Sequence, residues 1–272
     1  MKRVDKAVEI LRPQVPKKPY PYIEEEVAYQ NKEAGITLAG TLTLPPGKGP
    51  FPAVLLISGS GPQDRNETIY NHYPFLVLAD YLTRQGIAVL RVDDRGVGES
   101  TGDFSQATSE DFASDVLAGI EYLKTRKEIN PEQIGLIGHS EGGLIAPMVA
   151  VKSPDVAFIV LMAGPGLTGE EILYLQGALI SRAMGASEED IAKNRQFNEK
   201  IFSLIKEEKD KKIIEEKLRQ MFMEDWAELN EEEKSRIGDP EVFLKAQLQS
   251  LLSPWLKFFL TYDPKSTLSK VK

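Results

Sequence analysis

The sequence predicts an α/β protein in which a mostly parallel sheet is flanked by helices. Between residues 51 and 162, short apolar runs of strand length alternate with segments whose apolar residues recur at helical spacing. The strand-like runs are almost continuously apolar, as in parallel strands that are covered on both faces. We therefore expect helices on both sides of a parallel sheet.

Four strands and three helices account for this segment. The expected strands are 53–57, 87–92, 134–137 and 157–162, and the expected helices are 75–82, 112–123 and 144–151. Pro74 stands at the first position of the first helix, where the missing N–H of proline has no intrahelical partner to lose. Two further strand-like runs, 22–29 and 36–44, come earlier and are separated by a polar turn, so an N-terminal hairpin is expected.

The two ends of the chain have a different character. Residues 1–21 contain four prolines among charged residues and are expected to form an extended arm. After Gly166 the strand pattern stops, and helices are expected, with acidic residues at capping-box spacing after Thr168 and Ser187.

The last part of this helical region contains a long apolar stretch. A helix is expected to open at Asp239 and Pro240 and to continue to Leu260. Residues 263–272 are expected to form a loop.

Composition argues against several classes of function. The 272 residues carry a net charge of −8 and a pI near 5.1, so neither a nucleic-acid surface nor an anionic-membrane surface is expected. No apolar run reaches the length of a membrane span. The first residues lead into no signal-peptide stretch, which fits a cytoplasmic protein or an exported one that has lost an N-terminal segment. Cysteine is absent and histidine occurs only as His72 and His139, so no metal or organic cofactor is expected.

Residues 138–143, Gly-His-Ser-Glu-Gly-Gly, hold a Gly-x-Ser-x-Gly pattern directly between a predicted strand and a predicted helix. A nucleophile elbow has this order, and its turn is so tight that small residues must flank the serine. The serine is then exposed at the carboxyl edge of the sheet, beside N–H groups at the start of the helix. We therefore predict Ser140 as the nucleophile. A second match, at Ser100, lies in a loop well after its strand and is not expected to act.

Two other glycine-rich segments follow predicted strands and raise the alternative of a dinucleotide site. They are Ser-Gly-Ser-Gly-Pro at 58–62 and Asp-Arg-Gly-Val-Gly at 94–98. Neither completes Gly-x-Gly-x-x-Gly, because Asp64 and Thr101 occupy the third glycine position. A nucleotide-binding fold is therefore not expected.

In their residues and their order, the segments 58–62, 94–100 and 138–143 resemble the α/β-hydrolase superfamily. The similarity is greatest to bacterial serine esterases related to the prolyl-oligopeptidase and dienelactone-hydrolase branches, and it extends over residues 22–272. It implies an α/β-hydrolase core at 22–166 and an inserted helical cap at 167–262 that shapes the pocket. Residues 263–272 would then lead into further core strands.

The resemblance also implies roles for individual residues. Ser140 would attack a small-molecule ester and form an acyl-enzyme, with the backbone N–H of Glu141 as one oxyanion donor. The second donor comes from the loop after the third strand, which points to Ser60 just after Gly59.

The remaining polar residues of the glycine-rich loops can be sorted in the same way. Asp64, Arg65 and His72 are candidate substrate-binding residues near the pocket mouth. Asp94 and Arg95 are expected instead to brace the loops by hydrogen bonds and an ion pair.

A serine nucleophile needs a general base and an orienting acid, which in this superfamily follow the serine in the order acid, then histidine. No histidine follows Ser140. His139 is not expected to reach the Ser140 hydroxyl from within the same turn, and His72 has no identifiable acid partner. The sequence is therefore interpreted as a portion of a longer hydrolase, whose incomplete sheet would expose an edge and favour self-association.

Alternatives to an esterase remain open at this point. The absent base favours a non-catalytic α/β-hydrolase-fold protein used for binding or assembly. Within the enzyme class, a serine peptidase or an acyltransferase would use the same elbow.

Overall fold

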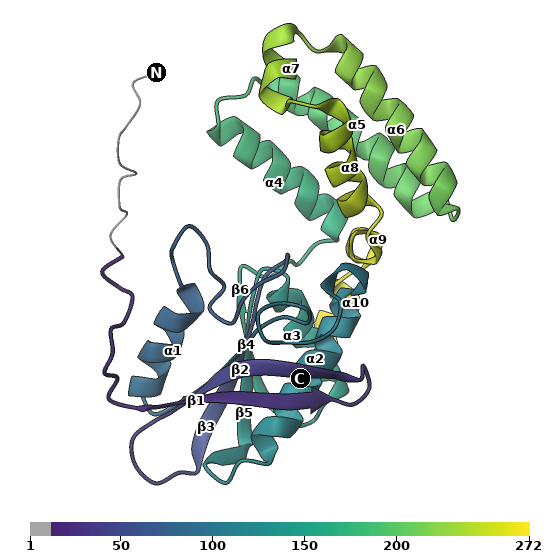
Figure 1. Ribbon diagram of the computed structural model, residues 1–272. Helices are drawn as coiled ribbons and strands as arrows, with labels where there is room; N and C mark the ends of the chain where they lie inside the picture. Colours follow the sequence, from purple (N-terminus) through teal and green to yellow (C-terminus); the bar gives the residue numbers. More distant parts are fainter. Residues whose placement is uncertain (1–11) are drawn as a thin grey trace. The chain divides into compact units, whose positions relative to one another are not determined.

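The computed structural model describes residues 12–272, without the side chains of residues 228, 232, 233 and 236 (Figure 1). The greater part of the expected arm, residues 1–11, thus lies outside the described residues. Contacts divide the chain into two compact units. The first contains the described residues up to Phe104, Glu110–Gly164 and Lys270–Lys272, and the second contains Ser105–Ser109 and Pro165–Ser269.

A six-stranded sheet forms the centre of the first unit, in the order β1-β2-β4-β3-β5-β6. Pairing is parallel between β3 and β4, β3 and β5, and β5 and β6, and antiparallel where β2 pairs with β1 and β4. The mostly parallel sheet and its N-terminal hairpin are therefore confirmed. The strands are β1 Ile23–Asn31, β2 Ile36–Leu44, β3 Phe51–Ile57, β4 Ala88–Val92, β5 Ile129–His139 and β6 Val156–Met162.

Helices cover both faces of this sheet, as predicted from the continuous apolar strands. Figure 1 shows α1 (Pro74–Arg84) on one side and α2 (Ser109–Lys124) and α3 (Gly142–Lys152) on the other. Alternate residues of β3 point to the two sides: Val54 and Leu56 pack with α1, whereas Leu55 lies against Gly119 of α2. A short 3₁₀ turn, Phe104–Gln106, precedes α2.

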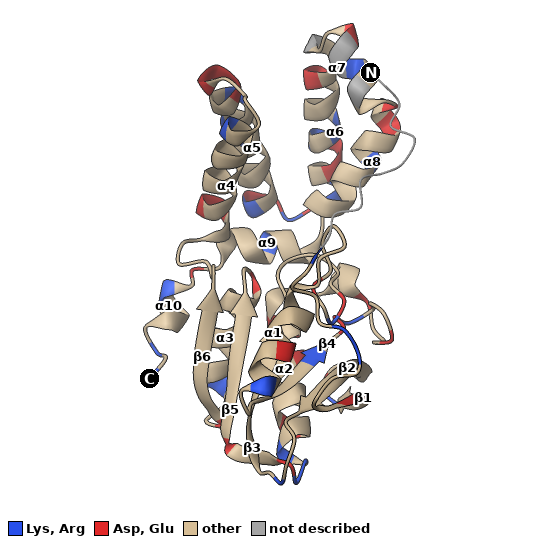
Figure 2. Ribbon diagram, turned by 90° about the vertical axis from the view of Figure 1, so that its left-hand side faces the viewer, with Lys and Arg blue, Asp and Glu red and all other residues tan. Residues whose placement is uncertain are grey.

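The second unit is helical, and Figure 2 shows acidic and basic residues along its helices. Both predicted capping boxes are confirmed: the hydroxyls of Thr168 and Ser187 accept N–H groups of the first turn. Apolar residues of several helices form a buried core around Leu218, Leu244 and Leu260. The helices are α4 Gly169–Ala183, α5 Glu188–Glu207, α6 Lys211–Glu228, α7 Glu231–Ile237, α8 Pro240–Leu251, α9 Pro254–Thr261 and α10 Lys265–Leu268.

Two expectations for the C-terminal part are wrong. The helix that opens at Pro240 ends at Leu251, and α9 begins separately at Pro254 with Ser253 as its N-cap. Proline lacks an N–H and disfavours a helical residue before it, so the helix cannot run through this position without a break. The expected loop 263–272 contains the single turn α10.

Strand β6 forms one edge of the sheet as far as the chain is described. Several of its apolar side chains are exposed, with Phe158 and Val160 each 43% exposed. The ring of Phe158 lies against Gly135 of β5, where a Cβ would overlap it.

Candidate active site

The turn between β5 and α3 holds Ser140 in the left-handed conformation, with φ 51°. This φ is uncommon for a residue with a side chain and is typical of a strained nucleophile elbow. The turn forms because its neighbours are glycines: a Cβ at Gly138 would overlap the carbonyl of Gly142, and a Cβ at Gly142 would overlap the carbonyl of Ile57. The structure thus places Ser140 between the carboxyl end of β5 and the start of α3, where the sequence predicts it.

Hydrogen bonds distinguish Ser140 from the second serine of the same pattern. The Ser140 N–H donates to the Met162 carbonyl at 2.9 Å, which fixes the elbow to the end of β6, and its side chain is half-buried. The Ser100 hydroxyl is buried, donates to the Asp93 carbonyl at 2.8 Å and accepts the Ala39 N–H at 2.9 Å. Ser100 therefore ties a loop to β2 and has a structural role.

The loop after β3 lies directly against the elbow. A Cβ at Gly59 would be 3.3 Å from the Cβ of Ser140. The exposed Ser60 follows in the loop, and Glu141 stands on the other side of Ser140 as the N-cap residue of α3. The N–H of Gly59, which directly precedes the expected oxyanion donor Ser60, donates to the Glu67 carboxylate at 2.7 Å.

Asp94 fastens this loop at both ends. Its two oxygens accept the Ser58 hydroxyl at 2.8 Å and the Gln63 N–H at 2.9 Å. Burial raises the pKa of Asp94 to about 7, although both hydrogen bonds act to lower it. Arg95 forms a buried ion pair with Asp115 at 2.7 Å. Both residues therefore brace loops, as the sequence predicts.

Arg65 and Asp64, the candidate substrate-binding residues, are engaged in contacts within the protein. The Arg65 guanidinium bonds to both oxygens of Asp93, at 3.1 and 2.7 Å, and to Glu99 at 2.9 Å. Asp64 accepts the N–H and the hydroxyl of Thr68 at 3.0 and 2.6 Å, closing a local turn.

The two histidines have different surroundings. His72 forms an isolated β-bridge with Ile69, and its Nδ1 lies 3.4 Å from the amide nitrogen of Gln14. His139 Nδ1 lies 2.7 Å from Oε1 of Glu67. Glu67 is the site residue that the sequence does not reveal, because it belongs to no motif and meets its partner 72 residues away.

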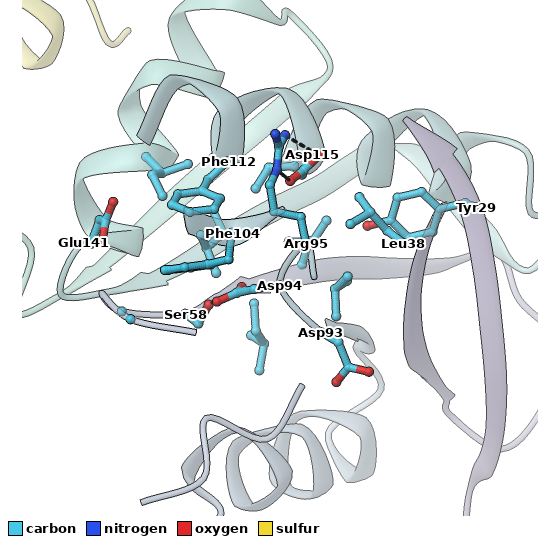
Figure 3. Close-up of a pocket in the computed structure, with 18 residues that line it drawn as sticks. Tyr29, Leu38, Ser58, Asp93, Asp94, Arg95, Phe104, Phe112, Asp115 and Glu141 are labelled. Atoms are coloured by element: carbon cyan, nitrogen blue, oxygen red, sulfur yellow. Dashed lines mark hydrogen bonds and ion pairs between the residues drawn. The ribbon is translucent and has the colours of Figure 1, made fainter. Parts of the chain in front are cut away.

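A cavity of about 50 Å³ lies in the first unit between the sheet and α2 (Figure 3). Asp94 and Glu141 contribute carboxyl groups to its wall, and the rings of Phe104 and Phe112 stack with centroids 5.2 Å apart. The cavity therefore lies next to the glycine loop and gives the Glu141 side chain a buried location.

The described residues contain neither a candidate metal site nor a candidate membrane span. Within residues 12–272, no three side chains of the metal-binding types are grouped so that they could hold an ion. In the same residues, no helix has the length and apolar character needed to cross a membrane.

With this geometry in place, the chain can be compared with known proteins. A model of the X-Pro dipeptidyl-peptidase (S15) family matches residues 6–238. Esterase EstD of Thermotoga maritima is 34% identical over 161 residues, which cover 57% of this chain and 38% of EstD. The putative hydrolase YtaP of Bacillus subtilis is 33% identical over 118 residues, which cover 36% of this chain and 38% of YtaP. The matches thus span well under half of the length of these two curated relatives.

The chain also matches parts of solved structures. The Pyrococcus furiosus esterase PF2001 matches with a TM-score of 0.49 and 22% identity, over 63% of this chain and 61% of that chain. The hypothetical protein PA2218 of Pseudomonas aeruginosa matches with a TM-score of 0.49 and 20% identity, over 67% of this chain and 61% of that chain.

Proposed function

This chain belongs to the X-Pro dipeptidyl-peptidase (S15) family, and we propose that it carries the nucleophile of a serine carboxylic-ester hydrolase. The observation that carries the proposal is Ser140 at φ 51° between β5 and α3, in a turn that only glycine neighbours permit. The similarity to Esterase EstD, an esterase by name, supports an ester as the substrate.

The proposed reaction proceeds through an acyl-enzyme. The Ser140 hydroxyl loses its proton to a general base as its oxygen attacks the ester carbonyl. The resulting oxyanion is bound by the N–H groups of Glu141 and Ser60, next to the N-terminus of α3. Collapse of this intermediate expels the alcohol, and water then releases the acid and regenerates Ser140.

We propose that the general base is neither of the two histidines of this sequence. His139 stands beside Ser140 in the same tight turn, from which its ring is not expected to reach the Ser140 hydroxyl, and its Nδ1 contacts Glu67. His72 is paired with Ile69 and Gln14 rather than with a carboxylate. The base and its acid would then be supplied by polypeptide outside these 272 residues. The greater length of the curated relatives supports this part of the proposal.

The remaining expectations are carried forward as proposals. Residues 22–166 would form the core, and residues 167–262 would act as a cap that selects small-molecule esters. The exposed apolar side chains of β6 would favour self-association through the sheet edge.

The first test is hydrolysis of p-nitrophenyl butyrate by the wild-type chain, Ser140→Ala and the control Ser269→Ala, which alters an exposed serine. Serine hydrolases that lack a triad member retain about 10³–10⁴-fold catalysis over water from the oxyanion hole and binding alone, so slow ester turnover does not by itself identify the nucleophile. We therefore expect slow turnover, together with slow covalent labelling by a fluorophosphonate that only Ser140→Ala removes. Labelling that is unaffected by Ser140→Ala would overturn the proposal.

Two further outcomes would select the alternatives. The family match favours a second candidate, a peptidase, which would cleave an X-Pro p-nitroanilide faster than the ester. A folded, monodisperse chain that ignores the ester, the anilide and the fluorophosphonate would favour a binding or assembly protein.

A further inference from the structure

The carboxylate of Glu67 connects the glycine loop to the nucleophile elbow. Glu67 is buried, at 7% exposed, and its backbone has a left-handed φ of 52°. This conformation is unfavourable for a residue with a side chain and persists only where the surrounding contacts hold it. Glu67 Oε1 accepts two hydrogen bonds, from the Gly59 N–H and from His139 Nδ1, each at 2.7 Å. Hydrogen bonds to an ionised carboxylate are stronger than those between neutral groups.

Three groups converge on the α-carbon of Gly59. A Cβ at this position would lie 3.2 Å from Glu67 Oε1, 3.3 Å from Ser140 Cβ and 3.4 Å from His139 Nδ1. Glu67 and His139 thus meet beside the proposed nucleophile, although neither belongs to the proposed oxyanion hole. Any side chain at Gly59 would press on all three groups, and glycine leaves the space for them.

We propose that Glu67 is a positioning residue for the oxyanion hole, an inference that rests on the proposed function of Ser140. By accepting the Gly59 N–H, the carboxylate fixes the Ser58–Gly59 peptide, which directly precedes the peptide that carries the Ser60 N–H. The loop is then fastened at Ser58 by Asp94 and at Gly59 by Glu67. These two contacts set the position of Ser60, the next residue, whose N–H is the proposed oxyanion donor.

His139 has a defined part in this arrangement. A carboxylate accepts hydrogen bonds but does not donate them, so the imidazole carries its proton on Nδ1. The bond also holds the ring on Glu67, and the N–H dipole of the neutral imidazole offsets part of the carboxylate charge beside a developing oxyanion. Glu67 therefore orients His139 and Gly59 together.

The tautomer of His139 provides a test that does not depend on catalysis. The chain contains two histidines, so ¹⁵N-histidine labelling gives two sets of ring signals, and His72→Gln assigns them. We expect the neutral His139 ring to be protonated at Nδ1 in the wild-type chain and in Glu67→Gln, whose amide oxygen still accepts. Glu67→Ala should shift the proton to Nε2. An Nε2–H tautomer in the wild-type chain would overturn the proposal.

The rate of fluorophosphonate labelling at Ser140 tests the effect on the oxyanion hole. Removing one oxyanion donor outright costs about 10²–10³-fold in rate, and a misplaced donor should cost less. We expect labelling to be about 10–100-fold slower in Glu67→Ala and within about threefold of wild type in Glu67→Gln. The control Glu99→Ala, which removes an exposed carboxylate paired with Arg65, should label at the wild-type rate.

These results separate the two proposals. If the wild-type chain does not label at Ser140 but shows the Nδ1–H tautomer, the proposed function fails while the contact of Glu67 stands. If Ser140 labels normally in folded Glu67→Ala, the positioning role is overturned while the nucleophile stands. Loss of labelling in His139→Gln equal to that in Ser140→Ala would make His139 the base, and would also overturn the positioning role.

Discussion

Replacing Asp94 by asparagine tests how burial acts on the carboxyl group that fastens the glycine loop. Burial raises the pKa of Asp94 from 3.8 to about 7. Between these pH values the native state binds a proton that the unfolded state has lost, so the free energy of unfolding falls as the pH rises. The stabilisation is complete below about pH 4 and lost above about pH 7. Three pH units at about 1.4 kcal/mol each give a total of about 4 kcal/mol.

Asparagine does not ionise, so the free energy of unfolding of Asp94→Asn should not fall in this way as the pH rises. From pH 5 to pH 8 the wild-type chain passes through about two of these three pH units. It should therefore lose about 3 kcal/mol relative to Asp94→Asn. The amide also loses part of the hydrogen bonding to Ser58 and Gln63, which costs about 1–2 kcal/mol at both pH values and cancels in the comparison.

The assay must report on the first unit, because both tryptophans, Trp226 and Trp255, lie in the second. Hydrogen exchange of peptides from β3, β4 and β5, measured by mass spectrometry at increasing urea concentrations, gives the required free energies. The control Glu33→Gln, an exposed carboxylate in the hairpin turn, should follow the wild-type pH dependence. A difference between wild type and Asp94→Asn that changes by less than about 1 kcal/mol from pH 5 to pH 8 would refute the reasoning.

Three further predictions concern the elbow, the core of the second unit and the sheet edge. Gly138→Ala should destabilise the first unit by more than about 3 kcal/mol, because the added Cβ would overlap a carbonyl. Gly177→Ala in α4 places its Cβ in open space and should stabilise the helix by about 0.5–1 kcal/mol. Urea-dependent hydrogen exchange measures both changes. Leu218→Ala, at a fully buried position, should cost about 2–5 kcal/mol, seen as a lower urea midpoint of tryptophan fluorescence, and an unchanged midpoint would contradict the core assignment. Val160→Lys on β6 should reduce self-association in light scattering after size-exclusion chromatography, and equal masses for both proteins would count against the edge as the contact.

The sequence predicted the sheet and the elbow because both leave local signals. Continuous apolar runs report burial on two faces, and the glycines beside Ser140 report a turn with no room for side chains. The break before Pro254 also had a local signal, since proline disfavours a helical residue before it. The apolar residues on both sides of Pro254 favour one continuous helix, and this pattern obscures the break.

The contacts of charged side chains could not be predicted in this way. Glu67 meets His139 across a long stretch of sequence, and Arg65 meets Asp93 from a separate loop. Neither pair has a periodicity or spacing that a single sequence can show. The sequence predicts a role for Arg65 only from the residues next to it in the chain. Its ion pair with Asp93 depends on how two separate loops meet in the fold.

The contact of Phe158 with Gly135 also has a consequence for any strand that joins the sheet. A shift of β6 by one residue would put the ring on the other face and leave Gly135 uncovered, so the alignment of β6 on β5 is locked. In the sheet of the described residues, the outer edge of β6 pairs with no further strand. Its N–H and C=O groups therefore offer hydrogen bonds to an added strand in a register that β5 determines. Because parallel strands end at the same edge, a parallel strand added to β6 would deliver the residues that follow it to the edge where Ser140 lies.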